Sequence, residues 1–242
     1  MKKTYFNWSS GKDSALALYK LLQNEEYQVD LLLTTVNQDT ERVSMHGLRI
    51  ELLERQLESL KIPSKLIRLS GDVSMESYNK IMQENTLELK EKGFAIAGFG
   101  DIFLEDLKEY REKELEKVGI KTVFPIWKEN TKDVLKQLFN LGFKAITVCV
   151  NGKLLDASYV GRIVDEDFIN SLPENVDPCG ENGEFHTFVF DGPIFSKPID
   201  FTIGEKVFKT YKPVKDDSNC FQSDEKQESW DTGFWYCDLI PK

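Results

Sequence analysis

The stretch that decides the fold is TYFNWSSGKDS, residues 4–14, in which β-forming residues lead into a Ser/Gly turn. Residues 13–23 follow with apolar side chains at helical spacing, so this part of the chain predicts a strand, a tight turn and a helix. Backbone N–H groups at the N-terminus of a helix attract anions, and the turn adds Ser9, Gly11, Lys12 and Ser14. Residues 9–14 therefore predict a phosphate-binding loop, called the phosphate loop below.

Helix capping is the alternative interpretation of this turn. Ser9 or Ser10 would cap the helix, with Asp13 in its first turn, as helix N-termini prefer. Capping does not explain why a glycine and a lysine stand together at the end of a strand, so we favour phosphate binding. The sequence is not the G-x-x-x-x-G-K-[ST] nucleotide loop, because the first glycine of that pattern is missing.

The first half of the chain continues the alternation of strands and helices. Strands are predicted at residues 4–8, 29–36, 65–69, 94–98 and 122–127, and helices at residues 13–23, 48–60, 75–92 and 103–118. This series predicts an α/β fold with a parallel five-stranded sheet covered by helices on both faces. Ligands of such sheets bind beyond the carboxyl ends of the strands, which is where the phosphate loop lies.

The pattern changes near residue 130. A helix at residues 133–141 is followed by strands predicted at 145–150, 186–190, 200–203, 207–211 and 234–240, and the polar residues 215–232 predict a long loop. We therefore expect residues 1–130 to form the domain with the parallel sheet. Residues 131–242 are expected to form a second, smaller α+β domain.

The composition excludes several classes of protein. The net charge is −10, whereas a domain that holds a nucleic-acid backbone normally carries a basic surplus. The four cysteines show no C-x-x-C spacing and the chain has two histidines, which argues against structural zinc and favours reduced, buried thiols. No apolar run is long enough for a membrane span or a signal peptide, so we expect a soluble cytoplasmic protein.

A second polar motif, PCGENGEFHT, occupies residues 178–187. It places Glu181, Glu184 and His186 between two glycines and a predicted strand. Carboxylates in a confined loop can bind Mg²⁺, orient an amine or act as a general base. A turn with solvated acids is the alternative, which we would favour for Glu181 alone but not for the whole motif.

Both motifs resemble those of known families. SSGKDS resembles the S-G-G-x-D-S signature of the PP-loop ATP pyrophosphatases, except that Ser10 replaces a glycine; a positive φ there would cost serine about 1 kcal/mol. PCGENGEFHT, followed by DGPIF at residues 191–195, resembles the C-terminal signature of the diphthine–ammonia ligase family. Met45-His46, residues 98–101 and Gly161-Arg162 with Asp165 agree in order, so the resemblance covers about residues 4 to 209.

The resemblance implies an adenine nucleotide α-hydrolase-like (HUP) fold and an ATP- and Mg²⁺-dependent amide ligase. Such an enzyme adenylates a carboxylate with release of pyrophosphate and then amidates it with ammonia or an amine. The implied nucleotide-binding residues are Ser9, Ser10, Gly11, Lys12, Asp13, Ser14, His46, Gly98 and Asp101. The implied catalytic residues are Lys12, Asp13, Glu181, Glu184 and His186, with Asp13 as the metal ligand. For Asp101 a structural role in its loop, and for His46 a place on the surface, are open alternatives.

Residues 43–49 and 98–107 depart from the diphthamide-making members of the family and resemble bacterial-type members. The ATP chemistry can therefore be kept while the acceptor differs, either a small molecule or a protein side chain. A tRNA-thiolating PP-loop enzyme and a non-catalytic ATP-binding regulatory module are the alternatives. The negative charge and the lack of C-x-x-C spacing argue against the tRNA-thiolating enzyme. The polar motif at residues 178–187 argues against the regulatory module. Whether the protein forms a homodimer is left open.

Overall fold

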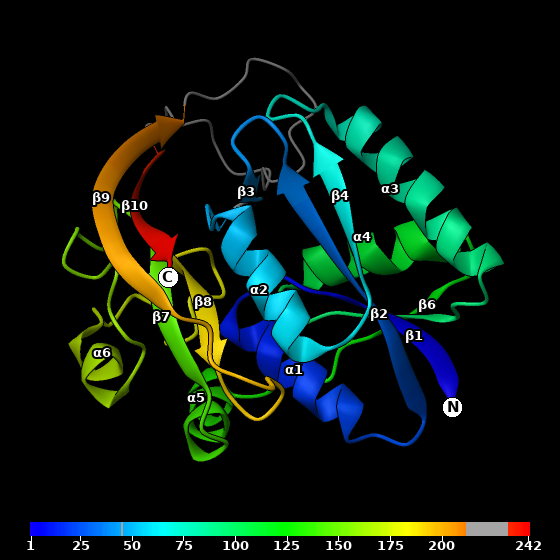
Figure 1. Ribbon diagram of the computed structural model, residues 1–242, viewed down its shortest axis with the longest axis horizontal. Helices are drawn as coiled ribbons and strands as arrows, with labels where there is room; N and C mark the ends of the chain where they lie inside the picture. Colours follow the sequence, from blue (N-terminus) through cyan, green and yellow to red (C-terminus); the bar gives the residue numbers. More distant parts are fainter. Residues whose placement is uncertain (45, 212–231) are drawn as a thin grey trace.

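The computed structural model describes residues 1–44, 46–211 and 232–242 (Figure 1). Its first sheet has the order β3-β2-β1-β5-β6, with β4 also paired to β2. The strands of this sheet are β1 (Lys2–Asn7), β2 (Tyr27–Asn37), β3 (Arg42–Val43), β4 (Ser64–Leu69), β5 (Ile96–Gly98) and β6 (Lys121–Val123). The predicted α/β fold with a parallel sheet is confirmed. The predicted number of strands was wrong by one, because the short strand β3 adds to β2 in the antiparallel direction.

Strands are added first on one side of β1 and then on the other, and this order locates the ligand-binding crevice at the carboxyl-terminal edge of the sheet. β1 pairs in parallel with β2 on one side and with β5 on the other. The chain builds outward through β2 and β4, returns, and then builds through β5 and β6. β1 and β5 therefore flank the point at which the strand order reverses, where α/β sheets bind their ligands. The Asn7 side chain donates a hydrogen bond of 3.1 Å to the Gly98 carbonyl and ties the two strand ends together.

Helices cover both faces of the first sheet. They are α1 (Lys12–Leu22) and α2 (Ile50–Leu60) on one face, and α3 (Met75–Glu91) and α4 (Glu105–Glu116) on the other (Figure 1). Successive residues of β1 point to opposite faces: Phe6 joins the cluster with α1 and α2, and Tyr5 joins the cluster with α3 and α4. β2 is therefore apolar over much of its length because it is buried on both sides.

The second sheet is antiparallel, with the order β8-β7-β10-β9. Its elements are α5 (Thr131–Asn140), β7 (Lys144–Asn151), α6 (Glu166–Ser171), β8 (Phe185–Asp191), β9 (Phe201–Tyr211) and β10 (Thr232–Pro241). The strands predicted at 200–203 and 207–211 are one strand, because β9 pairs with β10 along its length and continues through Gly204. The helix α6 was not predicted, and the loop predicted at 215–232 lies almost wholly outside the described residues.

The two sheets share one core. The larger cluster joins Leu16 of α1 and Leu53 of α2 to Leu138 of α5 and to Val148 and Phe188 of the second sheet. The layer made by α1 and α2 thus lies between the two sheets, and the division at residue 130 stays a prediction. Cys149, Cys179 and Cys237 are free and buried, as expected, whereas Cys220 lies outside the described residues. None of the described helices has the length and the apolar character that a membrane span needs.

Candidate functional site

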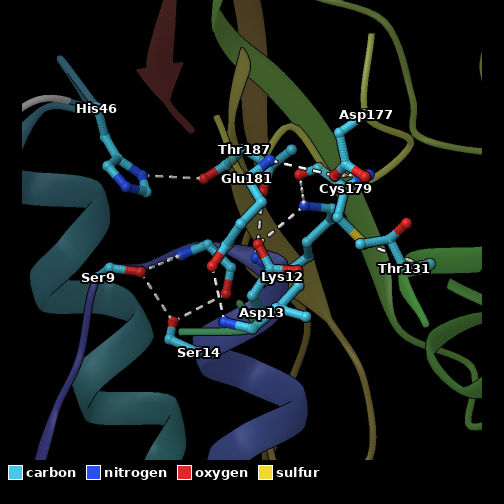
Figure 2. Close-up of polar contacts among 12 residues, drawn as sticks. Ser9, Lys12, Asp13, Ser14, His46, Thr131, Asp177, Cys179, Glu181 and Thr187 are labelled. Carbon is cyan, nitrogen blue, oxygen red and sulfur yellow. Dashed lines mark hydrogen bonds and ion pairs between the residues drawn. The ribbon is translucent and has the colours of Figure 1, made fainter. Parts of the chain in front are cut away.

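The phosphate loop follows β1 and enters α1 (Figure 2). The N-cap of α1 is Gly11, with φ −90°, and no side chain caps the helix. Ser9 Oγ instead donates to Ser14 Oγ over 3.0 Å, and Ser14 Oγ donates to the Gly11 carbonyl over 2.9 Å. The predicted serine cap was therefore wrong, although Asp13 does lie in the first turn of α1. The hydroxyls of Ser9 and Ser14 line the loop beside the first-turn amides of α1, which have no carbonyl partner within the helix.

Ser10 is the strained residue of the loop. Its φ is +71°, in the left-handed region, which costs a non-glycine residue about 1 kcal/mol. Its hydroxyl is buried and has no hydrogen-bond partner among the described residues. Its carbonyl, in contrast, accepts two hydrogen bonds, from the Val189 amide over 2.9 Å and from Gln56 Nε2 over 3.1 Å. The hydrogen bonds from Val189 and Gln56 therefore hold Ser10 in its strained backbone conformation.

Lys12 is turned into the interior of the protein. Its ammonium donates to Asp13 Oδ2 over 2.9 Å and to the Cys179 carbonyl, and it lies 5.2 Å from the centre of the Phe185 ring. Burial alone would lower the pKa of Lys12, but the Asp13 carboxylate and other acidic neighbours hold that pKa above its usual value. The sequence predicts Lys12 as a nucleotide-binding and catalytic side chain of the loop. The structure shows a buried cation that joins α1 to the second motif.

Asp13 has one oxygen bound and one oxygen free of partners. Oδ2 accepts from Lys12, and Oδ1 is buried with no hydrogen-bond partner among the described residues. Burial raises the pKa of Asp13, and Lys12 opposes this rise. Within the described part of the chain, no three His, Cys, Asp or Glu side chains are grouped to hold a metal ion by themselves. The free oxygen of Asp13 fits the other common arrangement, in which Mg²⁺ is held by one carboxylate and by substrate phosphates.

The second motif, residues 178–187, lies directly against the phosphate loop, as Figure 2 shows. The Lys12 amide donates to Thr187 Oγ1 over 3.1 Å. Glu181 Oε1 accepts from the Ile102 and Phe103 amides over 2.7 and 3.3 Å, beyond the end of β5. Burial, and then the Asp13 carboxylate, raise the pKa of Glu181 to about 7. This carboxyl group therefore changes charge near neutral pH, beside the crevice.

Glu184 is bound within its own loop. Its Oε1 accepts from the Asp177 amide and from Asn182 Nδ2, each over 3.0 Å, and the residue is 2% exposed. Its Oε2 is also buried and has no hydrogen-bond partner among the described residues. The carboxylate thus holds the loop in shape while the neighbouring Gly180 and Gly183 take positive φ values of 70° and 82°.

The two histidines of the chain form a stacked pair. The ring centres of His46 and His186 are 4.7 Å apart, and the ring planes differ by 25°. His46 Nδ1 lies 3.2 Å from the Thr187 carbonyl, which only accepts, so Nδ1 carries the proton. Burial, and then the charge of His186, lower the pKa of His46 to about 3. Burial, and then the charge of Lys12, lower the pKa of His186 to about 4. A Cβ on Gly11 would lie 3.1 Å from His46 Cε1, so the half-buried His46 ring forms a neutral wall of the phosphate loop.

Gly98 and Asp101 lie at the end of β5 but differ in what they contact. Gly98 accepts the hydrogen bond from Asn7, and a Cβ there would lie 2.6 Å from the Phe6 ring. Asp101 is paired with Arg111 of α4, with 3.0 Å between Oδ2 and Nε. The structure therefore brings Glu181, Thr187 and His186 to the phosphate loop, whereas Asp101 is held by α4 and Glu184 by its own loop.

Sequence reasoning missed Gln56 and the contacts of Val189. Gln56 is fully buried and touches the phosphate loop. One signal was present: Gln56 stands among Leu52, Leu53, Leu57 and Leu60 in the apolar stripe of α2. A polar residue in such a stripe needs a buried partner, but the sequence does not say which partner it has.

Comparison with known proteins places this site in a family. Residues 1–122 match the family model of the diphthamide synthase N-terminal domain, and residues 130–218 match that of the diphthamide synthase C-terminal domain. The diphthine–ammonia ligase of Bos taurus is 29% identical over 102 residues, which are 40% of this chain and 38% of the bovine protein. The enzyme of Schizosaccharomyces pombe is 30% identical over 100 residues, 40% of this chain and 16% of the yeast protein.

The chain thus spans about two fifths of the bovine relative and less of the yeast one. Among solved structures, the U34-tRNA thiolase NcsA from Methanococcus maripaludis with its [4Fe-4S] cluster is 17% identical, with a TM-score of 0.38, over 57% of this chain and 55% of that one. The resemblance that the two motifs indicated is confirmed by the family models, which cover both motifs. The chain belongs to the diphthamide synthase family.

Proposed function

We propose that the protein is an ATP-dependent amide ligase, which adenylates a carboxylate, releases pyrophosphate and transfers the acyl group to ammonia or an amine. One observation carries this proposal: the second motif forms the back of the phosphate loop. Thr187 accepts from the Lys12 amide and Glu181 binds the amides beyond β5, so acidic and neutral proton acceptors stand next to the anion site. An acceptor bound at the second motif and a nucleotide bound at the phosphate loop would therefore be neighbours and could react within the crevice.

In the first step a carboxylate oxygen attacks the α-phosphorus of ATP. The bond from that phosphorus to the bridging oxygen breaks, and its electron pair leaves with pyrophosphate. The first-turn amides of α1 other than that of Lys12, which donates to Thr187, and the hydroxyls of Ser9 and Ser14 would bind the growing negative charge. Mg²⁺, held by Asp13 Oδ1 and the phosphates, would supply further positive charge to the leaving group.

In the second step the lone pair of ammonia or an amine attacks the acyl carbon, and AMP leaves. The nitrogen must then lose a proton. Glu181 suits this role because its pKa is raised to about 7, near the pH at which it would work. Neutral His46, with its proton on Nδ1, would offer Nε2 only as a hydrogen-bond acceptor, because a pKa of about 3 makes this ring a poor base.

The products of ATP cleavage test this proposal. Phosphorus NMR of reactions with ATP, Mg²⁺, ammonia and a panel of carboxylates is expected to show AMP and pyrophosphate, formed only with the right acceptor. ADP with orthophosphate would defeat the proposed mechanism. AMP formation that requires tRNA would favour the thiolating alternative, and tight ATP binding without any turnover would favour the regulatory module.

The affinity for ATP tests the loop itself. Ser14→Ala removes the hydroxyl that joins Ser9 to the Gly11 carbonyl, and we expect it to weaken ATP binding by about tenfold, which is 1.4 kcal/mol. Ser59→Ala is the matched control, since Ser59 is a buried serine of α2 that binds the carbonyl of Lys197 and not the loop. Isothermal titration should show weaker binding for the first variant only.

A further inference from the structure

Gln56 joins three segments that are far apart in the sequence. Its Oε1 accepts from Trp8 Nε1 over 3.1 Å, and its Nε2 donates to the carbonyls of Ser10, over 3.1 Å, and Val189. The indole N–H of tryptophan only donates and backbone carbonyls only accept, so these partners fix the orientation of the carboxamide. The side chain is fully buried and its donors and acceptor are used at the end of β1, the phosphate loop and β8.

The contact with Ser10 falls on the strained residue of the phosphate loop. The Ser10 carbonyl is held by Gln56 Nε2 and by the Val189 amide, while the residue itself has a φ of +71°. Without these two donors a serine would gain about 1 kcal/mol by returning to a common conformation. The bonds to the carbonyl therefore oppose the local preference of the backbone.

Holding this carbonyl also sets the direction of the next amide. The peptide between Ser10 and Gly11 is planar and trans, so its N–H points away from its C=O. The Gly11 N–H accordingly points to the side of Ser9 Oγ, 3.4 Å away, on the side of the loop that carries the hydroxyls of Ser9 and Ser14. A rotation of this peptide would remove one donor from the anion site.

We propose that Gln56 is a positioning residue of the phosphate loop: it keeps Ser10 in the left-handed conformation and so aims the Gly11 amide at a bound phosphate. This inference rests on the proposed function, because it assumes that the loop binds the phosphates of ATP. Gln56 acts through Ser10 and touches no ligand itself.

The experiment compares the affinities of folded variants for ATP and for inorganic pyrophosphate by isothermal titration. Gln56→Met keeps the length of the side chain and removes its donor and acceptor, and we expect it to bind both ligands about tenfold more weakly. Ser59→Ala, on the same helix, is the control: it should lower the unfolding temperature and leave both affinities unchanged. Gln56→Asn, which keeps the amide but is one methylene shorter, is measured alongside as the milder variant and should also lose affinity.

A double-mutant cycle with Ser10→Gly separates positioning from general stability. Glycine adopts a φ of +71° without strain, so a loop with Ser10→Gly needs less external support. The tenfold loss from Gln56→Met should therefore shrink to about twofold or less when Ser10→Gly is also present. A purely structural role would give the same loss in both backgrounds and would overturn the inference.

Two failures can be told apart. If the wild-type protein binds neither ATP nor pyrophosphate, the phosphate-loop function fails and takes the inference with it. If the wild-type protein binds both and Gln56→Met and Gln56→Asn bind them equally well, only the role of Gln56 is refuted.

Discussion

The two faces of the first sheet differ in how they treat polar groups. Towards α3 and α4 the sheet is closed by apolar side chains, and its ion pairs lie exposed at the surface, as Lys65–Glu88 and Lys92–Glu88 do, or partly buried at the strand ends, as Asp101–Arg111 does. Towards α1 and α2 the sheet shares its core with the second sheet, and this core encloses the charged Lys12 and the amide of Gln56. Burying a polar group costs free energy unless it is hydrogen-bonded. The buried polar groups therefore indicate that the face towards α1 and α2 is the one that carries the binding site.

The largest effect is expected for Lys12→Met, which tests the face towards α1 and α2 by removing its buried cation. The variant leaves Asp13 and the Cys179 carbonyl without their cation, and we expect the free energy of unfolding to fall by about 3 kcal/mol. Lys136→Met is the control, because Lys136 pairs with Asp133 on the surface of α5. Urea denaturation measures both variants, and equal small effects would mean that the buried cation contributes no more than a surface one.

The next effect is a pH dependence at Glu181. Its pKa is raised from 4.5 to about 7, so the folded state binds more protons than the unfolded state between these values, and stability should fall as the pH rises. Glu181→Gln should remove this fall, which is about 2.5 kcal/mol between pH 5 and pH 8. His46 and His186 have lowered pKa values and give a slope of opposite sign, so the difference between wild type and variant at each pH is the quantity to measure.

A smaller effect, of the opposite sign, is expected at Ser10. Ser10→Gly relieves the positive φ and removes a buried hydroxyl that has no partner among the described residues, at the cost of a more flexible unfolded chain. We expect a net gain of about 1 kcal/mol in the free energy of unfolding. Calorimetry that finds a lower unfolding temperature would show that the serine makes a contact the present geometry lacks.

The smallest effect belongs to the other face. Glu88 accepts from Lys92 over 2.5 Å and from Lys65, and these bonds lower its pKa to about 2, but the carboxylate is exposed to solvent and salt. Glu88→Gln should leave the unfolding temperature unchanged at physiological ionic strength. A clear drop in the unfolding temperature would show that exposed ion pairs also stabilise the face towards α3 and α4.

Local patterns were sufficient to predict most of the fold. The alternation of apolar runs and helical stripes identified the elements from β1 to α4 in order, apart from β3, since each of these signals lies within a few neighbouring residues. β3 has two residues and no such signal, and β9 was divided in two because Gly204 and Glu205 suggest a turn when β10 is not in view. Pairing between distant strands decided both cases.

The candidate site divides in the same way. Residue type and spacing identified the phosphate loop and residues 178–187, but not the direction of a side chain. Lys12 turns inward because the Cys179 carbonyl and Asp13 lie there, and Gln56 reaches the loop only because α2 packs against it. Such contacts depend on three-dimensional packing, which a single sequence does not specify.

The contacts of Thr187 and Val189 with the phosphate loop also have a consequence for the order in which the site forms during synthesis. Lys12 and Thr187 are 175 positions apart, so the loop leaves the exit tunnel long before Thr187 has been synthesised. At roughly 5–20 residues per second, the interval is about 10–35 s. During that time the Ser10 carbonyl lacks the Val189 donor that helps to hold its left-handed conformation, and Lys12 lacks its carbonyl partner at Cys179. Under the proposed function, we therefore expect ATP binding only after β8 has been added to the chain.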